Sequence, residues 1–375
     1  MSSRPADLDI TRDIETLTAD LINIPSESRH EASLADLVFE QLQRLPYLSV
    51  VRDGNTVVAR TNLGRAERVV LAGHLDTVPS SGNDVAIVVR AGERAPIADA
   101  AGTLDVTEDR LYGLGACDMK GGVAVGLRLA ATVESPTRDV TYIFYDCEEI
   151  EANFNGLKRI AETHPDWLAA DFAVLMEPSN AGVEGGCQGT MRIEVRTSGR
   201  RAHTARGWMG VNAIHGANEI LQRLNAYEPR RVDIDGLEYR EGLQAVFING
   251  GVAGNVVPDE CVVTINHRYA PSRSSEDAEA HLREVFAGFD VTVVDNVAGA
   301  MPGLSQPAAK AFVEAVGSEP MPKFGWTDVA RFSGLGIPAV NFGPGSATLA
   351  HAPNEYVPLS HLHTCESALR TWLTN

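Results

Sequence analysis

The sequence is poor in cysteine and in basic residues, and each shortage excludes a class of protein. Its 375 residues include five cysteines, and no CxxC pair occurs among them. Neither a disulfide framework nor a thiolate zinc knuckle is therefore indicated. Lysine and arginine number 32 against 50 aspartates and glutamates, which gives a net charge of −18. A surface of this sign repels phosphate backbones and anionic lipids, so we expect neither nucleic acid nor a membrane as partner.

Long apolar runs and targeting segments are also missing. No stretch approaches the ~18 consecutive apolar residues of a membrane span. The polar, acidic start MSSRPADLDI lacks the basic and apolar regions of a signal peptide. We therefore expect a reduced, cytoplasmic protein. The hydrophobic share of 44% and the charged share of 22% are typical of globular chains, and the length favours about two domains.

Several common catalytic motifs are absent as well. The pair Gly113 and Gly115 is followed by Asp118 where a dinucleotide-binding motif requires its third glycine. The patterns GxxxxGK[ST], HExxH and GxSxG do not occur. These absences exclude a P-loop, a zincin helix and a nucleophile elbow.

Apolar periodicity predicts an α/β domain at both ends of the chain. Three- and four-residue spacing predicts helices at 14–21, 34–42 and 121–133, and short apolar runs predict buried strands at 69–71, 140–145, 172–176 and 337–342. The strand–helix–strand order favours a mainly parallel sheet covered by helices.

The pattern changes near Gly182. Residues 191–196 alternate, with Met191, Ile193 and Val195 on one side, as in a strand with one face in water. Further patterns predict helices at 214–224 and 275–286 and strands at 244–249, 262–269 and 291–294. We therefore expect a catalytic α/β domain at 1–183 and 297–375, interrupted at 184–296 by an inserted α+β domain of the ferredoxin-like type.

Polar side chains follow the predicted strands of the α/β domain. The first strand runs into His74 and Asp76, the second into Glu148 and Glu149, and the third into Glu177. The carboxyl ends of the strands form the ligand crevice in open α/β sheets. Two further candidates stand in loops, Asp118 in the glycine-rich turn GLGACDMKGG and His351 in GPGSATLAHAPNE.

This collection of imidazoles and carboxylates matches a two-metal hydrolytic site in ligand type. Zinc and similar cations accept both kinds of donor, and two ions ~3.5–4 Å apart need a shared ligand. Neighbouring residues on a strand point in opposite directions, so one of Glu148 and Glu149 can bind metal while the other faces substrate. His74 and Asp76 share a face, so Asp76 can orient the imidazole.

Each candidate also has a simpler explanation. A histidine at a strand end is usually a satisfied polar group, and adjacent glutamates are usually solvated. Asp118 suits a turn or a helix N-cap. Cys117 and Cys147 stand beside the candidate site, either as a nucleophile paired with a histidine or as small packing residues. Spacing alone leaves these alternatives open, and only the coincidence of ligand types at several strand ends favours the metal site.

The motifs GHLDTVP (73–79), GACDMKGG (115–122), CEE (147–149) and MEPS (176–179), followed by His351, resemble those of the M20 family of dinuclear zinc aminoacylases and carboxypeptidases. They occur in the family's order across nearly the whole chain. The resemblance implies a catalytic α/β domain with an inserted lid and dimerisation domain, hence a homodimer. It also implies two divalent ions, zinc in the first place, with cobalt as a substitute.

The resemblance assigns a role to each candidate ligand. His74 and Glu177 would bind one ion, Glu149 and His351 the other, and Asp118 would bridge them. 

It also assigns the residues that act on the substrate. Glu148 would be the general base that takes a proton from a water held between the ions, and Asp76 would orient His74. His203, in the RAHTA segment of the inserted domain, would steady the oxyanion in the partner subunit's active site.

Within the family, the segments FYDCEEIEANFNGL, GCQGTMRIEV, RAHTARGWMGVNAIH and GWTDVARF are similar to those of actinobacterial enzymes that remove succinate from N-succinyl-LL-2,6-diaminopimelate in lysine biosynthesis. The resemblance implies that the substrate's carboxylates are held by Asn255, Arg268, Thr327 and Arg331. Two alternatives remain: a deacetylase of acetylornithine or another N-acyl amino acid, and a non-catalytic binding protein of the same fold. The second is expected to have lost a ligand, and none is missing here.

Overall fold

The computed structural model describes residues 8–375, and the chain forms two compact units. Unit 1 comprises the chain up to Gly185 together with Gly303–Met321 and Thr327–Asn375. Unit 2 comprises Gly186–Pro302 and the short segment Pro322–Trp326. One α/β unit is therefore interrupted by an inserted unit.

Unit 1 is built on an eight-stranded sheet with the order β1-β2-β6-β3-β7-β16-β8-β15. Its central strands β6, β3, β7 and β16 are parallel, while β1, β2 and β8 pair antiparallel. The predicted, mainly parallel sheet is confirmed for this centre. The strands are β1 (Ser49–Asp53), β2 (Thr56–Arg60), β3 (Arg68–His74), β6 (Asp139–Tyr145), β7 (Phe172–Leu175), β8 (Glu184–Gly185), β15 (Met321–Pro322) and β16 (Ala339–Asn341).

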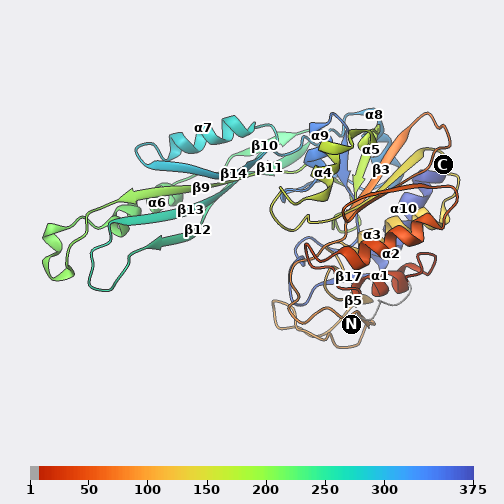
Figure 1. Ribbon diagram of the computed structural model, residues 1–375, viewed down its shortest axis with the longest axis horizontal. Coiled ribbons are helices and arrows are strands. Elements are labelled where there is room, and N and C mark those ends of the chain that lie inside the picture. Colours follow the sequence, from red (N-terminus) through yellow and green to blue (C-terminus); the bar gives the residue numbers. More distant parts are fainter. Residues whose placement is uncertain (1–7) are drawn as a thin grey trace. The chain divides into compact units, whose positions relative to one another are not determined.

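Helices cover this sheet, as its apolar strands require. Helix α3 packs on β3 and β6 and contacts α1 and α10, and Figure 1 shows α3 and α10 on one side of the sheet and α4 and α9 on the other. The Asp13 carboxylate caps α1 by accepting the Thr16 N–H, and Asn155 caps α4 through Lys158. The helices are α1 (Ile14–Ile22), α2 (Ala32–Gln43), α3 (Lys120–Thr132), α4 (Gly156–Thr163), α5 (Pro165–Leu168), α8 (Pro307–Val316), α9 (Val329–Gly334) and α10 (Leu359–Thr374).

A small sheet, β17-β5-β4, completes unit 1. Its strands are β4 (Ile87–Val89), β5 (Arg110–Tyr112) and β17 (Tyr356–Pro358). No helix within residues 8–375 is long and apolar enough to cross a membrane.

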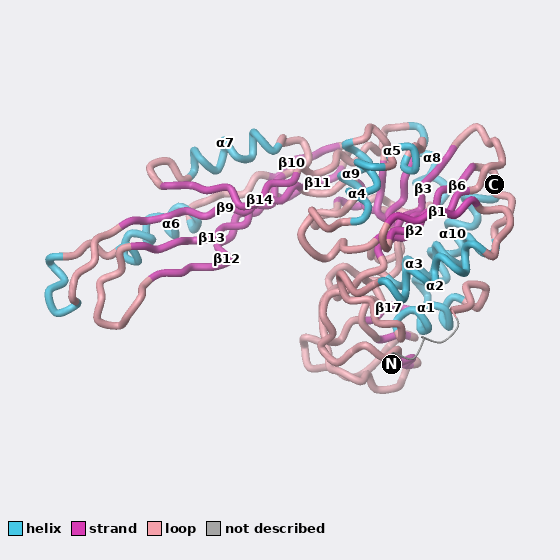
Figure 2. Tube along the Cα trace, in the orientation of Figure 1, coloured by secondary structure: helices cyan, strands magenta, loops and turns pink. Residues whose placement is uncertain are grey.

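Unit 2 is an antiparallel sheet with the order β12-β13-β9-β14, packed against two helices (Figure 2). A separate ribbon of β10 and β11 accompanies it. The elements are β9 (Gly189–Ser198), the 3-10 helix η1 (Thr204–Met209), α6 (Ala213–Asn225), β10 (Arg231–Ile234), β11 (Leu237–Arg240), β12 (Gly242–Gly250), β13 (Glu260–Tyr269), α7 (Ser275–Val285) and β14 (Asp290–Val297). The inserted α+β fold is therefore present as predicted.

The core of unit 2 lies between the sheet and the two helices. Met191, Ile193 and Val195 point into it, as their alternation predicts. Helix α6 forms where the spacing predicts a helix, and it buries the stripe of Ala213, Ala217 and Ile220. The larger Ile214 and Leu221 are left 40% and 38% exposed. The apolar surface of α6 is therefore wider than the part that packs on the sheet, and the rest of it is exposed.

Candidate active site

Three parallel strands of unit 1 bring their polar ends to one edge of the sheet. In the register of β3 with β6, His74 pairs with Tyr145, and Glu148 and Glu149 follow in the loop after β6. In the register of β3 with β7, Ala72 pairs with Leu175, so Glu177 stands two residues beyond that pair, as His74 does. Parallel register therefore collects these side chains where the sequence predicted a crevice.

Asp118 faces two histidines. Its Oδ1 lies 3.1 Å from Nε2 of His74, and its Oδ2 lies 3.5 Å from Nε2 of His351. The helix N-cap of α3 is Met119, which excludes the capping alternative for Asp118. A carboxylate with one oxygen facing each of two imidazoles is suited to be shared by two ions.

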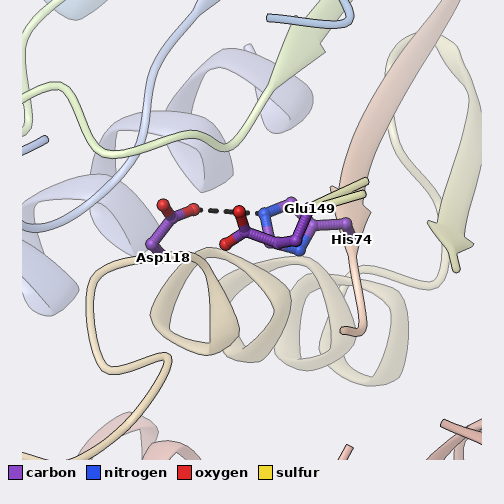
Figure 3. Close-up of side chains that lie close together, drawn as sticks. All are labelled: His74, Asp118 and Glu149. Carbon is purple, nitrogen blue, oxygen red and sulfur yellow. Dashed lines mark hydrogen bonds and ion pairs between the residues drawn. The ribbon is translucent and has the colours of Figure 1, made fainter. Parts of the chain in front are cut away.

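Glu149 adds a second carboxylate to this group. Its Oε2 lies 2.9 Å from Nε2 of His351. One ligand atom from each of His74, Asp118 and Glu149 lies within 4.8 Å of the others, and Figure 3 shows these three side chains pointing toward one another. Glu177 is buried at the same sheet edge but is not part of this group of three.

Glycines at the start of α3 allow this close assembly. A Cβ atom on Gly122 would lie 2.2 Å from the carbonyl oxygen of Met176, the residue before Glu177. Glycine is a poor helix former, yet no other residue fits at this approach. The GG pair of the motif GACDMKGG therefore lets the helix after Asp118 contact the end of β7.

Asp76 connects His74 with the loop of the two glutamates. The Nδ1 atom of His74 lies 3.0 Å from the main-chain oxygen of Asp76 and 3.5 Å from its carboxylate. The same carboxylate accepts the N–H groups of Glu148 at 3.0 Å and Glu149 at 3.1 Å. The Ser28 hydroxyl donates to it at 2.7 Å. Ser28 was not identified in the sequence, because nothing in the spacing links it to Asp76.

Burial and neighbouring charges shift the pKa values of the residues in this group. Burial acts to lower the pKa of His74, but the contacts with Asp118 and Asp76 outweigh it and raise that pKa well above its ordinary value. The hydrogen bonds to Asp118 and Glu149 raise the pKa of His351 to about 10. Burial raises the pKa of Glu148 well above that of an ordinary carboxyl, with the charge of Glu177 adding to the effect.

The donor set fits a divalent metal ion. Imidazole nitrogens and carboxylate oxygens converge from buried His74, partly buried Asp118 and Glu149, and exposed His351, and each histidine lies within 3.1 Å of a carboxylate oxygen. Zinc and related ions of borderline softness accept these donors. The residues present therefore suit a metal centre.

The two cysteines near the site do not suit a nucleophile. Cys117 is buried, and burial raises the pKa of its thiol well above the ordinary value. Cys147 donates its S–H to Oε1 of Glu31 at 3.2 Å, and burial raises its pKa to about 12. A nucleophilic cysteine needs a lowered pKa, so these thiols serve packing.

Comparison with known proteins agrees with this geometry. Residues 70–375 match peptidase family M20/M25/M40. The chain belongs to the M20 family. Membership makes it a hydrolase whose chemistry depends on divalent metal ions, and the non-catalytic alternative is excluded.

Relatives and a solved structure extend over nearly the whole chain. A Mycobacterium tuberculosis protein that carries the name DapE is 52% identical over 98% of this chain and 99% of its own length. The succinyl-diaminopimelate desuccinylase of Corynebacterium glutamicum is 43% identical over 98% of each chain. The crystal structure of a Staphylococcus aureus tripeptidase covers 98% of each chain with a TM-score of 0.76 at 20% identity, which shows the fold.

Three of the remaining sequence candidates belong to unit 2. His203 is exposed at the start of η1, where its Nδ1 accepts the Ala205 N–H at 3.1 Å. Asn255 is exposed, and its main-chain oxygen accepts the Thr204 N–H. Arg268 is partly buried in β13, and its guanidinium makes no hydrogen bond or ion pair with any residue in 8–375.

The last two candidates lie in unit 1 and already have partners. The Thr327 hydroxyl donates to Oδ1 of Asn341 at 2.9 Å. Arg331 forms an ion pair with the buried Asp328. The guanidinium of Arg331 is therefore already paired with a carboxylate of the protein.

Proposed function

We propose that this chain hydrolyses the succinyl amide of N-succinyl-LL-2,6-diaminopimelate to succinate and LL-2,6-diaminopimelate, a step of lysine biosynthesis. The observation that carries the proposal is the position of Asp118 between His74 and His351. The chain is also 43% identical to a succinyl-diaminopimelate desuccinylase over 98% of its length. The metal in the site is proposed to be zinc, for which cobalt can substitute.

The proposed ligands form two sets that share Asp118. His74 and Glu177 would hold one ion, and Glu149 and His351 would hold the other. The contacts of Asp118 with both histidines support this division. Divalent ions bound there lower the pKa of a water molecule and polarise the amide carbonyl.

Glu148 is the proposed general base. Its N–H donates to the Asp76 carboxylate at 3.0 Å, in the same loop that carries Glu149. Its raised pKa suits a group that accepts a proton from the attacking water and then donates it to the leaving amine. Asp76 in turn orients His74, which it contacts through both main chain and carboxylate.

Substrate carboxylates require cationic or polar partners in this acidic protein. Arg268 supports the proposal best, because its guanidinium has no partner within residues 8–375 and burial lowers its pKa. Asn255, Thr327 and Arg331 complete the proposed set of substrate-binding residues. His203, exposed in unit 2, is proposed to donate a hydrogen bond to the oxyanion in the active site of a partner subunit.

The proposed homodimer forms through unit 2. Strand β12 is an edge of its sheet, and Val246, Phe247 and Ile248 are 46%, 64% and 51% exposed. Ile214 of α6 is exposed beside the end of this strand, since a Cβ on Gly250 would lie 2.9 Å from it. An apolar edge strand with free main-chain groups is a surface that a second copy can cover.

A comparison of two substrates tests the proposed function. We expect zinc-loaded enzyme to show a much higher kcat/KM for N-succinyl-LL-2,6-diaminopimelate than for N-acetylornithine, and chelation to abolish both activities. A preference for N-acetylornithine would keep the metal chemistry and replace the substrate with that of a deacetylase. Turnover that survives complete removal of metal would contradict the proposed mechanism.

A further inference from the structure

A buried carboxylate outside the proposed ligand set lies directly behind Asp118. Glu355 is 1% exposed and follows His351 by four residues. Its Oε1 accepts the N–H of Cys117 at 3.0 Å and the N–H of Asp118 at 3.1 Å. One oxygen atom therefore holds two successive amides of the turn that carries the shared ligand.

The main chain of Glu355 joins the same turn to the loop of His351. Its carbonyl oxygen accepts the Gly113 N–H at 3.1 Å, and its own N–H donates to the oxygen of Ala352 at 3.0 Å. Glu355 thus contacts both the turn that carries Asp118 and the loop that carries His351. These segments lie more than 200 residues apart in the chain, so no local structure connects them.

This placement is costly unless it serves the turn. Burial of a carboxylate carries a desolvation penalty, and Glu355 is almost completely buried. The hydrogen bonds from the turn offset part of this penalty. The amides at 117 and 118 point inward, where buried N–H groups need an acceptor.

We propose that Glu355 is a positioning residue for the metal centre: it fixes the main chain at residues 117–118, so that Asp118 presents one oxygen to each histidine. It acts through Asp118 and touches neither substrate nor reacting atoms. The inference rests on the proposed role of Asp118 as the shared ligand. Residues that orient ligands in this way typically change metal affinity 10–100-fold when they are removed.

Two substitutions separate the position of the acceptor oxygen from its charge. Glu355→Gln keeps an oxygen at the same reach and removes the charge, whereas Glu355→Asp keeps the charge but is one methylene shorter. Asp139→Asn is a matched control. Asp139 is also a buried carboxylate of unit 1 that accepts two main-chain N–H groups, from Leu63 at 2.8 Å and Arg65 at 2.9 Å. It stands at the start of β6, away from the strand ends that form the site.

The experiment is a calorimetric titration of metal-free full-length protein with Zn²⁺, together with the visible spectrum of the Co²⁺-loaded form and thermal unfolding of each variant. We expect Glu355→Asp to weaken Zn²⁺ binding by roughly 10–100-fold and to change the Co²⁺ spectrum. Glu355→Gln should stay within about threefold of wild type. Asp139→Asn should lower the unfolding temperature without changing Zn²⁺ affinity.

Wild-type Zn²⁺ affinity and an unchanged Co²⁺ spectrum in Glu355→Asp would overturn the inference while leaving the proposed function intact. Weaker binding in Asp139→Asn equal to that in Glu355→Asp would also overturn it, because general loss of stability would then explain both. Absence of Zn²⁺ binding in the wild type would refute the proposed function itself, and the inference with it.

Discussion

Two fully buried histidines, one in each unit, show what distinguishes a proposed metal ligand from a core residue. His74 of unit 1 and His267 of unit 2 both lie on strands and are both 0% exposed. His74 faces the carboxylates of Asp118 and Asp76, which raise its pKa despite burial. Neither ring nitrogen of His267 has a hydrogen-bond partner in residues 8–375, and burial lowers its pKa to about 4. Burial is therefore common to both, and the carboxylate partners make the difference.

The two units as wholes show the same contrast between polar clusters and apolar packing. Unit 1 gathers carboxylates and histidines at one sheet edge, where their arrangement suits metal binding and catalysis. Unit 2 encloses an apolar core and leaves apolar side chains exposed on β12 and α6. Substitutions in unit 1 should therefore affect chemistry, and substitutions in unit 2 should affect stability and association.

The largest effect is expected from Glu148→Gln in unit 1. Removal of a general base typically costs 10²–10⁴-fold in rate, and we expect kcat to fall by about 10³-fold. Zn²⁺ affinity should change little, because Glu148 is not a proposed ligand. Steady-state kinetics and Zn²⁺ titration of the same preparation check both points. Near wild-type turnover would remove Glu148 from the role of base.

A core substitution in unit 2 should show the opposite behaviour. Ile193 is buried in the central part of its sheet, and Ile193→Ala should lower the free energy of unfolding by roughly 2–5 kcal/mol. Urea unfolding measures this loss, and Zn²⁺ affinity under folding conditions should remain that of the wild type. A loss of Zn²⁺ affinity in Ile193→Ala would show that the stability of unit 2 affects the metal site of unit 1.

The edge of β12 provides a third comparison. A charge at Phe247, which is 64% exposed, should weaken self-association by about 100-fold in Phe247→Asp. Val294→Asp is the control, since Val294 is 47% exposed on β14, the opposite edge strand. Sedimentation equilibrium should detect dissociation only in the first variant. Equal behaviour of the two variants would exclude β12 as the dimer contact.

The smallest expected effect concerns pH. His267 has a folded-state pKa of about 4, below the ordinary 6.5, so the unfolded chain binds a proton that the folded chain does not. The contribution of neutral His267 to the free energy of unfolding is therefore fully present above pH 6.5 and is lost as the pH falls toward 4. At pH 5 the loss is about 2 kcal/mol. His267→Leu should remove this loss. Urea unfolding at pH 7.5 and pH 5 tests it, and an unchanged difference between the two pH values would argue against a neutral His267.

Much of this architecture could be predicted from the sequence, because apolar periodicity marks elements with one or two buried faces. The strands β3, β6 and β7 and the polar residues at their ends followed from such patterns. Which apolar side of α6 faces the sheet could not be predicted, since two adjacent stripes of that helix are apolar. The C-terminal helix α10 was not predicted.

The supporting contacts of the site could not be predicted either. Ser28 reaches Asp76 across 48 residues, and Glu355 reaches Cys117 across 238. Such contacts join one side chain to a distant carboxylate or main-chain amide and leave no period in the sequence. They become visible only when the fold brings the segments together.

The most direct test of the account is Zn²⁺ titration of metal-free wild type beside Asp118→Asn. If Asp118 is shared by two ions, the wild type should bind two Zn²⁺ per chain, and the substitution should weaken both binding steps by at least about 10-fold. Two sites of wild-type affinity in Asp118→Asn would contradict the central claim that this carboxylate joins the two halves of the centre.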